Sequence, residues 1–458
     1  MRGGRLMLAK VQRRTPTSMT DGYDLPNGAE QSRQLHDGAL EVFPGGVSHN
    51  IRHAEPHPLY VTEAEGSRIR DADGNEYVDF WMNHITSVLG HAHPEVVAAV
   101  RDQAEQGLHY GAVNEKALEL GRRVTEYVPS AERVRFCSSG TEATMYAVRL
   151  ARAATGGTRL LKAEGGWHGG NTDLSASIHT PFDEPETVGL PPGAAEHVHS
   201  FPVNDREAVE ALLSEHGEEV AAIIVEPMLL AGGGVECEPD FLEYLRDATE
   251  DNGALLIFDE VVTGFRVSPG SYQARVGVTP DLTTMGKFLG GGLPVGALGG
   301  QAALFEHSRP DVETDRPVLA GGGTFSMNPM TATAGLASLG IVESEPVYEY
   351  TESQAGRVRS ELAGVFEELG IETTTLGTGS LFLTHFQPEG PLETVGDVET
   401  ATNREALHEF HRRLLAHGYY FLPGHMGAVS YQTTEEELDG LIDASRSVAA
   451  EMQSEGML

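Results

Sequence analysis

Short apolar runs alternate with stretches of helical periodicity from about residue 60 onward. Ala221–Val225 and Ala254–Phe258 are apolar throughout, and Arg133–Cys137 is typical of a further strand. A helical pattern follows it from Ser138 to Ala154. Strands that are apolar on both faces indicate a sheet covered by helices on both sides, and such sheets are mostly parallel. The pattern therefore predicts an α/β layered fold.

The pattern changes after about residue 330. Residues 330–344, 350–369 and 435–452 have helical periodicity, and residues 380–386 form an apolar run typical of a strand. Residues 180–198, rich in Pro, Glu and Gly, are interpreted as a loop. We therefore expect four segments along the chain: a basic extension at 1–20, an N-terminal segment at 21–75 that joins the small domain, a large domain at 76–330, and an α+β C-terminal domain at 331–458.

The net charge of the chain argues against some classes of binding partner. The formal net charge is −36, with 32 Lys and Arg against 68 Asp and Glu. Such a field argues against nucleic acid or an anionic membrane as a partner, and no run of about 18 apolar residues predicts a spanning helix. Only four of the basic residues are lysine and 28 are arginine. Acid excess with loss of lysine indicates adaptation to high intracellular salt, where self-repulsion is screened.

The cysteine content and the first 20 residues bear on the cellular location of the protein. Cys137 and Cys237 are the only cysteines, too few for a disulfide framework, which fits a reducing cytoplasm. Residues 1–20 carry basic side chains and no acid. Because they have no apolar segment after these charges, we interpret them as a disordered extension, or as the result of a start codon placed before Met7 or Met19, in preference to a targeting segment.

One of the four lysines stands out, because Lys10 lies in the basic extension and Lys116 and Lys162 are expected in or beside helices. Lys287 lies between an apolar run and three glycines, in Thr283–Gly292. A chain that uses arginine for its surface cations keeps a lysine there for a reason, and an amine can form a Schiff base whereas a guanidinium cannot. Asp259 comes 28 residues earlier, at the carboxyl end of a predicted buried strand. Open α/β sheets bind their ligands at this edge.

Anion-binding and aromatic elements accompany this pair. Ser139-Gly140-Thr141 follows a predicted strand and begins a helix, where free N–H groups and the helix dipole favour an anion. Trp167 lies among glycines in residues 164–170 and suits stacking on a flat ring, and Gly321–Pro329 supplies a second hydroxyl site before a helix. A phosphate cup, a stacking aromatic, a carboxylate and a lysine together match the needs of pyridoxal 5′-phosphate.

The motifs also carry a specific resemblance. They are Phe43–Val47, Asp71–Asn75, Gly90–Pro94, Ser139–Ala143, Phe258–Arg266, Pro280–Lys287 and Gly323–Phe325. In this order the chain resembles the class III, fold-type I, PLP-dependent aminotransferases, in the branch of glutamate-1-semialdehyde 2,1-aminomutase. The resemblance implies a large domain with a mostly parallel seven-stranded sheet and a smaller α+β C-terminal domain.

The same resemblance implies roles for single residues. Lys287 is the expected Schiff-base lysine and Asp259 the partner of the pyridine nitrogen. Ser139, Gly140 and Thr141 are expected at the phosphate, with Thr324 reaching in from another subunit, so that the active unit is a homodimer or a larger homo-oligomer. Trp167 is expected on the ring face, and Glu226 and Val261 complete the cofactor contacts.

The substrate side departs from the aminomutase pattern. Arg52 is retained and suits a substrate carboxylate, but His49 replaces a serine and His84 replaces a tryptophan. The late loop, Leu422–Gly427, has no acid where the aminomutase has a glutamate that helps to hold its diamine intermediate. We therefore expect a cytoplasmic ping-pong aminotransferase that acts on an amino acid donor and an oxo acid or aldehyde acceptor.

Other outcomes stay open. Intramolecular amino transfer by the aminomutase, which gives 5-aminolevulinate, is the alternative reaction, and decarboxylation, racemisation or PLP binding without catalysis are less favoured. His49, His84, His91, His93 and His168 lie in or near the motifs without paired ligand spacing on a helix, so no metal is expected.

Overall fold

A computed structural model of the chain describes residues 25, 27–191, 193–311 and 316–458. The predicted basic extension therefore lies outside the described residues. The chain divides into two compact units. One comprises the described residues up to Thr62 together with Asp71–Asn75, and the other comprises Glu63–Arg70 and Glu76–Leu458. The predicted domain limits at residues 20, 75 and 330 stay predictions.

The first unit is small. It contains α1 (Glu30–Leu40) and the short 3-10 turns η1 (Pro44–Gly46) and η2 (Asn50–Arg52). Asp73 accepts hydrogen bonds from the N–H groups of Gln31 and Ser32, which fixes the start of α1 on the turn at 71–75. Asn75 accepts from the N–H of Asn27 at 2.9 Å.

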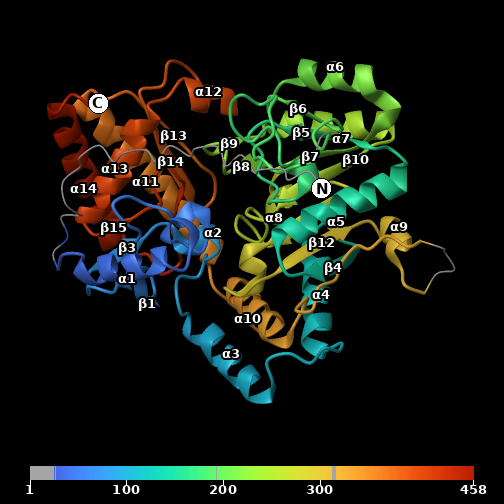
Figure 1. Cartoon of the computed structure of the whole chain (residues 1–458), viewed down its shortest axis with the longest axis horizontal. Coiled ribbons are helices and arrows are strands. Elements are labelled where there is room, and N and C mark those ends of the chain that lie inside the picture. Colours follow the sequence, from blue (N-terminus) through green and yellow to red (C-terminus); the bar gives the residue numbers. More distant parts are fainter. Residues whose placement is uncertain (1–24, 26, 192, 312–315) are drawn as a thin grey trace, which may run out of the picture. The chain divides into compact units, whose positions relative to one another are not determined.

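A seven-stranded sheet organises the second unit (Figure 1). Its strands lie in the order β4 (Arg133–Cys137), β12 (Gly296–Gly300), β11 (Leu282–Gly286), β10 (Leu255–Glu260), β7 (Val220–Val225), β5 (Arg159–Ala163) and β6 (Val198–Phe201). β12 runs antiparallel to β4 and β11, and the other pairings are parallel. The predicted α/β class and mostly parallel sheet are confirmed.

Both faces of this sheet are buried, as its apolar strands predict. Along β7, Ile223 and Val225 pack with α6 (Arg206–His216) and α7 (Pro239–Asn252), whereas Ala222 and Ile224 pack with α5 (Gly140–Thr155) on the other face. All of β7 is buried. Burial on two sides leaves no strand face for water, so ligand contacts concentrate at the strand ends.

Near β4 and β12, further helices complete the large region. They are α3 (Pro94–Gln106), α4 (Glu115–Tyr127), α8 (Ser271–Val276), α9 (Ala302–Phe305) and α10 (Pro329–Ser344). β8 (Met228–Leu229) and β9 (Val235–Glu236) form a short hairpin after β7. The 3-10 turn η5 (Lys287–Gly290) follows β11 directly.

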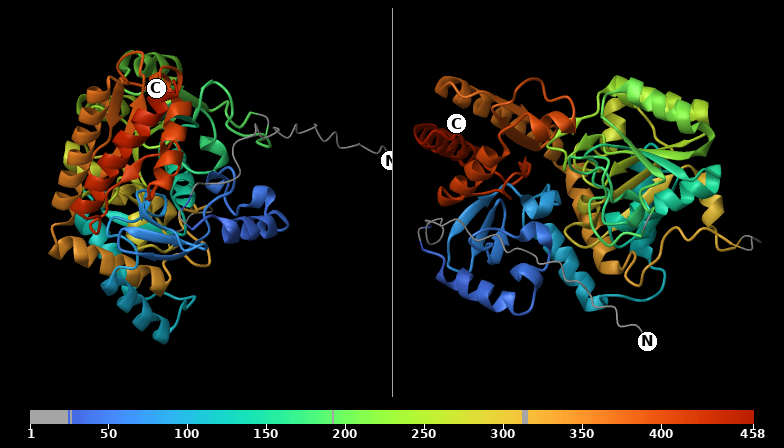
Figure 2. Two further views of the ribbon diagram at one scale, coloured as in Figure 1. Left: turned by 90° about the vertical axis from the view of Figure 1, so that its left-hand side faces the viewer. Right: turned by 45° about the horizontal axis from the view of Figure 1, so that its top comes forward.

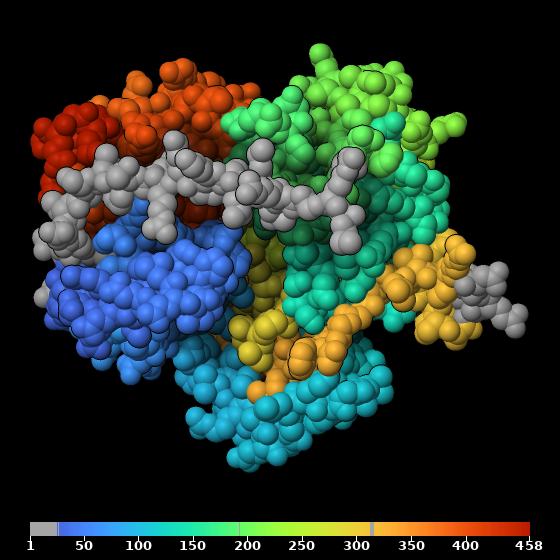
Figure 3. Space-filling model, in the orientation of Figure 1, coloured from blue at the N-terminus to red at the C-terminus, as the bar shows by residue number. Residues whose placement is uncertain are grey.

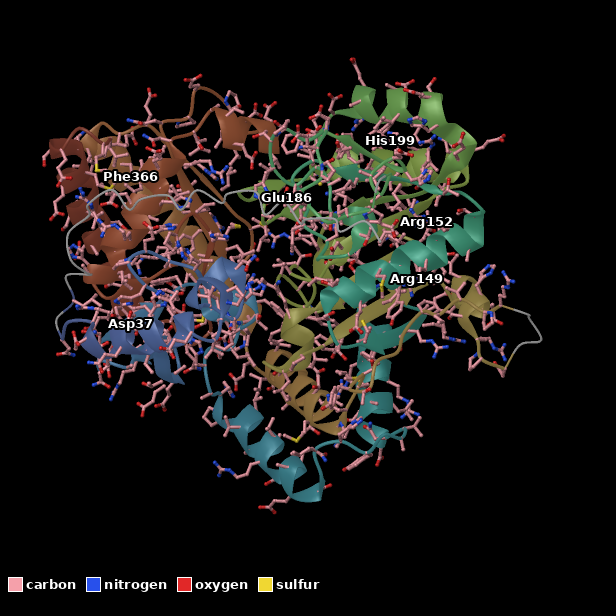
Figure 4. All side chains as sticks on the ribbon, viewed as in Figure 1. Asp37, Arg149, Arg152, Glu186, His199 and Phe366 are labelled. Carbon is pink, nitrogen blue, oxygen red and sulfur yellow. The ribbon has the colours of Figure 1, made fainter. Side chains whose placement is uncertain are left out.

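The C-terminal region carries a second sheet with helices beside it (Figure 2). β13 (Thr373–Leu376), β14 (Leu381–Phe386) and β16 (Gly427–Ala428) pair antiparallel, and α11 (Val347–Leu369), α12 (Val395–Thr400), α13 (Arg404–Ala416) and α14 (Glu435–Ser454) accompany them. Phe366, labelled in Figure 4, packs edge-on against Phe386 and Phe410. The helices and the strand expected here from periodicity are confirmed within a few residues.

A smaller sheet connects early and late segments. The chain passes from the first unit into the second in β1 (Val61–Glu65). β2 (Arg68–Asp71) pairs antiparallel with β3 (Glu76–Asp79), and β15 (Tyr419–Tyr420) pairs with β3 in parallel. The segment after β3 therefore starts from a fixed point beside the C-terminal region.

That segment, α2 (Met82–Ile85), is a single left-handed turn without glycine. The φ angles of Met82, Asn83, His84 and Ile85 are 42°, 56°, 61° and 58°. A left-handed conformation costs an L-residue roughly 1–2 kcal/mol, and it is a marked outlier for a β-branched residue such as Ile85. The surrounding contacts must supply the compensation.

Lys162 is placed differently from the sequence-based expectation. With Lys116 it was expected in or beside a helix, but it lies in β5 and is fully buried. Its Nζ donates to the carbonyl oxygens of Gly166 at 2.9 Å and Ala176 at 2.6 Å. The apolar neighbours Leu160, Leu161 and Ala163 mark a strand, and the lysine interrupts that pattern. Lys116, by contrast, is half exposed in α4.

Among the described residues, no helix combines the length and the apolar character that crossing a bilayer requires.

The burial of Lys162 predicts a specific pH dependence. Burial lowers its pKa to about 8, against the opposing effect of Glu226 and Glu186, whereas an unfolded lysine titrates near about 10.4. Between these values the unfolded chain binds more protons, so the contribution of Lys162 to the free energy of unfolding rises with pH. We expect the free energy of unfolding of the wild type minus that of Lys162→Met to grow as pH rises from about 8 to about 10.

Urea unfolding at constant salt would measure this difference. Lys116→Met, at a half-exposed position, is the matched control and should give a flat difference over the same range. A flat difference for Lys162→Met would contradict the expectation.

Candidate functional site

Three adjacent strands end at one edge of the large sheet, and each brings one ionisable side chain there. Glu226 follows β7, Asp259 is the fifth residue of β10, and Lys287 follows β11. Asp259 is in register with Thr284 of β11. The parallel pairing of β7, β10 and β11 thus gathers two carboxyl groups and one amine from positions up to 61 residues apart in the sequence.

Asp259 is buried and held by three hydrogen bonds. Its Oδ1 accepts from the Thr284 hydroxyl at 2.9 Å and from the Val261 N–H at 3.1 Å. Its Oδ2 lies 2.8 Å from Nδ1 of His168. A carboxylate offers about four lone pairs, so Oδ2 keeps one acceptor position for a further N–H donor.

His168 orients this carboxylate. Because an ionised carboxylate only accepts, Nδ1 of His168 carries the proton and donates it. Burial lowers the pKa of His168, with Asp259 opposing and Lys162 adding to the shift, and this favours the neutral ring. The Thr144 hydroxyl donates to the His168 carbonyl oxygen at 2.7 Å and fixes the backbone at the same point.

Lys287 opens η5 with a positive φ of 46°. Burial lowers the pKa of its amine, and the charge of Arg266 acts in the same direction, while Glu226 and Asp259 oppose it. A lower pKa increases the fraction of neutral amine, which is the form that acts as a nucleophile or a base.

The loop after β5 carries Trp167 beside His168. The Trp167 N–H donates to Oε1 of Glu226 at 2.8 Å, and the indole is 50% exposed. Burial raises the pKa of Glu226 to about 8, with Asp259 adding to the effect. The hydrogen bonds from Lys162 Nζ to the carbonyl oxygens of Gly166 and Ala176 hold the two ends of this loop together.

The start of α5 forms a tight cradle. The Ser139 hydroxyl accepts from the Glu142 N–H at 3.2 Å as the N-cap. A Cβ on Gly140 would lie 2.9 Å from the methyl groups of Val261, and one on Gly169 would lie 2.2 Å from the Thr141 hydroxyl oxygen. Glycine at both positions therefore lets the loop after β10 and the Trp167 loop approach the first turn of α5, where N–H groups are unsatisfied within the helix.

The remaining predicted residues lie in separate places. Thr324 is exposed, in a loop whose Gly323 lies near Glu142 and Ser138. His84 lies in the left-handed turn with its ring 4.7 Å from that of Trp81. Arg52 and His49 belong to the first unit, where Arg52 donates to the Ser48 hydroxyl at 3.1 Å. The structure brings together Asp259, Lys287, Glu226, Val261, Trp167 and the Ser139–Thr141 turn, and contacts with substrate stay predictions.

Several neighbours of the site were missed by sequence reasoning. His168 was considered only as a metal ligand, although its position beside Trp167 in a glycine-rich loop was a signal for the same site. Thr284, Lys162 and Arg266 gave no signal of their own. Among the described residues no group of three or more His, Cys, Asp or Glu side chains is arranged to hold a metal ion; His91 instead pairs with Asp79 at 2.8 Å.

Pyridoxal 5′-phosphate fits these residues. The free lone pair of Asp259 suits a protonated pyridine nitrogen, the exposed face of Trp167 suits a ring, and the glycine-lined start of α5 suits a phosphate. The buried amine of Lys287 suits the aldehyde of the cofactor.

Known proteins are similar to this chain in sequence and in fold. The family model described as aminotransferase class-III matches residues 50–442. The chain is 36% identical over 422 residues to a glutamate-1-semialdehyde 2,1-aminomutase of Methanosarcina acetivorans, covering 91% of this chain and 97% of the relative. It is 41% identical over 364 residues to the enzyme of the same name from Halorubrum lacusprofundi, covering 79% and 81%.

Solved structures agree. An omega-transaminase from Sphaerobacter thermophilus has a TM-score of 0.86 at 33% identity, covering 92% of this chain and 97% of that one. A beta-phenylalanine aminotransferase from Variovorax paradoxus has a TM-score of 0.85 at 30% identity, covering 93% and 95%. This chain therefore belongs to the class III aminotransferases, and its cofactor is pyridoxal 5′-phosphate.

Proposed function

We propose that this enzyme transfers an amino group between a carboxylate-bearing amino donor and an oxo acid or aldehyde, in two half-reactions that share one site. The observation that carries the proposal is the meeting of Lys287, Asp259 and Glu226 at three adjacent strand ends. When bound, the cofactor supplies an electron sink for the carbon that bears the substrate amino group.

Each residue of the site has a separate role in the proposed reaction. Lys287 would hold the cofactor covalently and, once released, its neutral Nζ would take a proton from the amino-bearing carbon of the donor in one half-reaction and deliver a proton to the carbonyl carbon of the acceptor in the other. Asp259, oriented by His168 and Thr284, would keep the ring nitrogen protonated. Ser139, Gly140 and Thr141 would hold the phosphate and Trp167 would cover the ring, while Glu226 and Val261 would fix the loops around it. Arg52, His49 and His84 are the proposed contacts with the substrate.

The aminomutase reaction is the second candidate. It is supported by the names of relatives that cover nearly the full chain, including the one from Methanosarcina acetivorans at 36% identity. The late loop favours intermolecular transfer instead. Leu422–Gly427 contains His425 but no acid, so the loop offers no carboxylate to retain a diamine through both half-reactions.

A cytoplasmic homodimer is the proposed form of the enzyme. Gln103 alone is buried in α3, every residue of which is described. A cavity of about 400 Å³ opens beside α3 and is lined by Val96, Val97 and Val100. The segment from α3 to the start of α4 lies at the lower edge of Figure 3, and its apolar side chains Leu108, Tyr110, Val113 and Leu118 are 46–101% exposed. We propose that a second copy covers this surface and that Thr324 of one chain reaches the phosphate bound by the other.

The acidic surface supports adaptation to high salt. The net charge of −36 and the loss of lysine fit a protein that requires screening of its self-repulsion. Relatives from Halorubrum lacusprofundi and Haloquadratum walsbyi are 41% and 40% identical to this chain.

The acceptor requirement tests the reaction class. We expect purified enzyme to turn over an amino acid donor repeatedly only when an oxo acid is added, and to convert about one equivalent of donor per site to its oxo acid when no acceptor is present. A panel of α-amino acids, β-amino acids and 4,5-diaminovalerate would be followed by the visible spectrum of the cofactor. Lys287→Ala should lose covalent cofactor retention, and Lys116→Ala should keep it. Rapid reaction with the diaminovalerate alone would overturn intermolecular transfer in favour of the aminomutase.

The dimer predicts a surface variant. Arginine at Leu108 and Val113, which are 63% and 101% exposed, should halve the mass measured by light scattering, because two charges would be buried between copies. Val188→Arg, at 98% exposure in another loop, is the matched control and should leave the mass unchanged. An unaltered mass for the double variant would exclude this surface as the interface.

Salt dependence tests the proposed adaptation. We expect the midpoint of thermal unfolding to fall steeply when salt is lowered below about 0.5 M, because the repulsion among carboxylates is then less screened. Circular dichroism across a salt series would measure it. A midpoint that is independent of salt would contradict adaptation to high salt.

A further inference from the structure

Arg266 is a fully buried cation without an acidic partner. It is 1% exposed, and within the described part of the chain no carboxylate lies at ion-pair distance from it. Burial lowers its pKa to about 9. Buried charges are normally paired. The hydrogen bonds that Arg266 makes must therefore compensate for the free-energy cost of removing its charge from water.

Those hydrogen bonds meet at the left-handed turn. One Nη of Arg266 donates to the carbonyl oxygens of Ile85 at 2.7 Å and Ser87 at 3.1 Å. The other donates to the hydroxyl of Ser380, just before β14, at 2.8 Å. The planar fork of a guanidinium reaches acceptors on two sides at once, whereas an ammonium is a single point.

The turn is fixed at its other end by Asp79. Oδ1 of Asp79 accepts from the N–H groups of Trp81 and Met82 at 2.7 and 3.0 Å, and Oδ2 pairs with His91. A negative charge thus holds the start of the turn and a positive charge holds its end. Backbone in this unfavourable region persists where its surroundings over-determine it, and such places are often functional.

The turn determines where two rings point. Trp81 lies directly before it and His84 lies in it, with ring centroids 4.7 Å apart. His425 of the late loop packs edge-on against Trp81 at 5.4 Å. His49, His84 and the late loop are the three places where the sequence departs from the aminomutase pattern on the substrate side.

We propose that Arg266 is a positioning residue that clamps the left-handed turn Met82–Ile85, so that Trp81 and His84 face the substrate in one fixed arrangement with His425. The proposal rests on the proposed function for the role of the site. The clamp itself is a property of the folded chain and is testable without substrate.

The chain has two tryptophans, so Trp167→Phe leaves Trp81 as the sole reporter. A protonated imidazole quenches the fluorescence of a neighbouring indole, and Trp81 emission in the full-length protein should fall on acidification. His84→Asn in this background separates the quenching by His84 from that by His425. With Arg266→Lys, which keeps the charge but replaces the planar group that donates to the carbonyl oxygens of Ile85 and Ser87, we expect the His84-dependent fall to drop at least twofold.

Two variants separate the clamp from general stability. Ser380→Ala removes one acceptor and leaves the contacts with Ile85 and Ser87, so its quenching should equal that of the background. Equal quenching in Arg266→Lys, measured well below its unfolding midpoint, would overturn the clamp. In the unaltered protein, the amides of Ile85, Thr86 and Ser87 should exchange with deuterium as slowly as those of β3; exchange at the rate of an open loop would overturn it as well, even if the Arg266 variants do not fold.

The proposed function has a separate readout. Borohydride-trapped labelling of Lys287 by pyridoxal 5′-phosphate, located by peptide mass, reports whether this amine reacts with the cofactor. Failure of wild-type Lys287 to be labelled would refute the proposed function and leave the clamp untouched.

Discussion

The parallel pairing of β10 with β7 on one side and β11 on the other is the constraint on which the site depends. It aligns three strand ends, so Glu226, Asp259 and Lys287 meet although they are distant in sequence. A slip of one residue would turn Asp259 toward the opposite face of the sheet. The register is well determined because β7 and β10 are buried on both faces, so that a slip would disturb side-chain packing on both sides of the sheet.

Burial then makes these groups act on one another. At this sheet edge and in the loops that approach it, Lys162, His168, Glu226, Asp259, Arg266 and Lys287 interact in pairs. Low dielectric strengthens each interaction, so the protonation of Lys287 reflects its neighbours as well as its own solvation. The hydrogen bonds of His168, Thr284 and Trp167 hold these groups where the interactions are strong.

Three of the seven strands, β4, β7 and β10, were predicted from the sequence pattern, β7 and β10 because they are apolar runs, and Asp259 and Lys287 stood out as polar residues beside apolar segments. Lys162 was misplaced because a charged residue broke the pattern of β5, and only the carbonyl oxygens of Gly166 and Ala176 explain its burial. The pairing of His168 with Asp259 joins residues 91 apart, which no local pattern predicts. The left-handed turn at Met82–Ile85 contains no glycine to announce it, and tertiary contacts alone impose it. Roles in binding substrate are beyond local patterns for the same reason.

The positions of the lysines determine where amine-reactive reagents can attach to the protein. Of the three lysines that the structure describes, Lys162 is fully buried, Lys287 is partly exposed and Lys116 is half exposed; Lys10 lies outside the described residues. A reagent or solid support that reacts with amines therefore meets few competing lysine side chains on the described surface. Once Lys287 holds its cofactor, Lys116 is the described lysine through which such a reagent would couple.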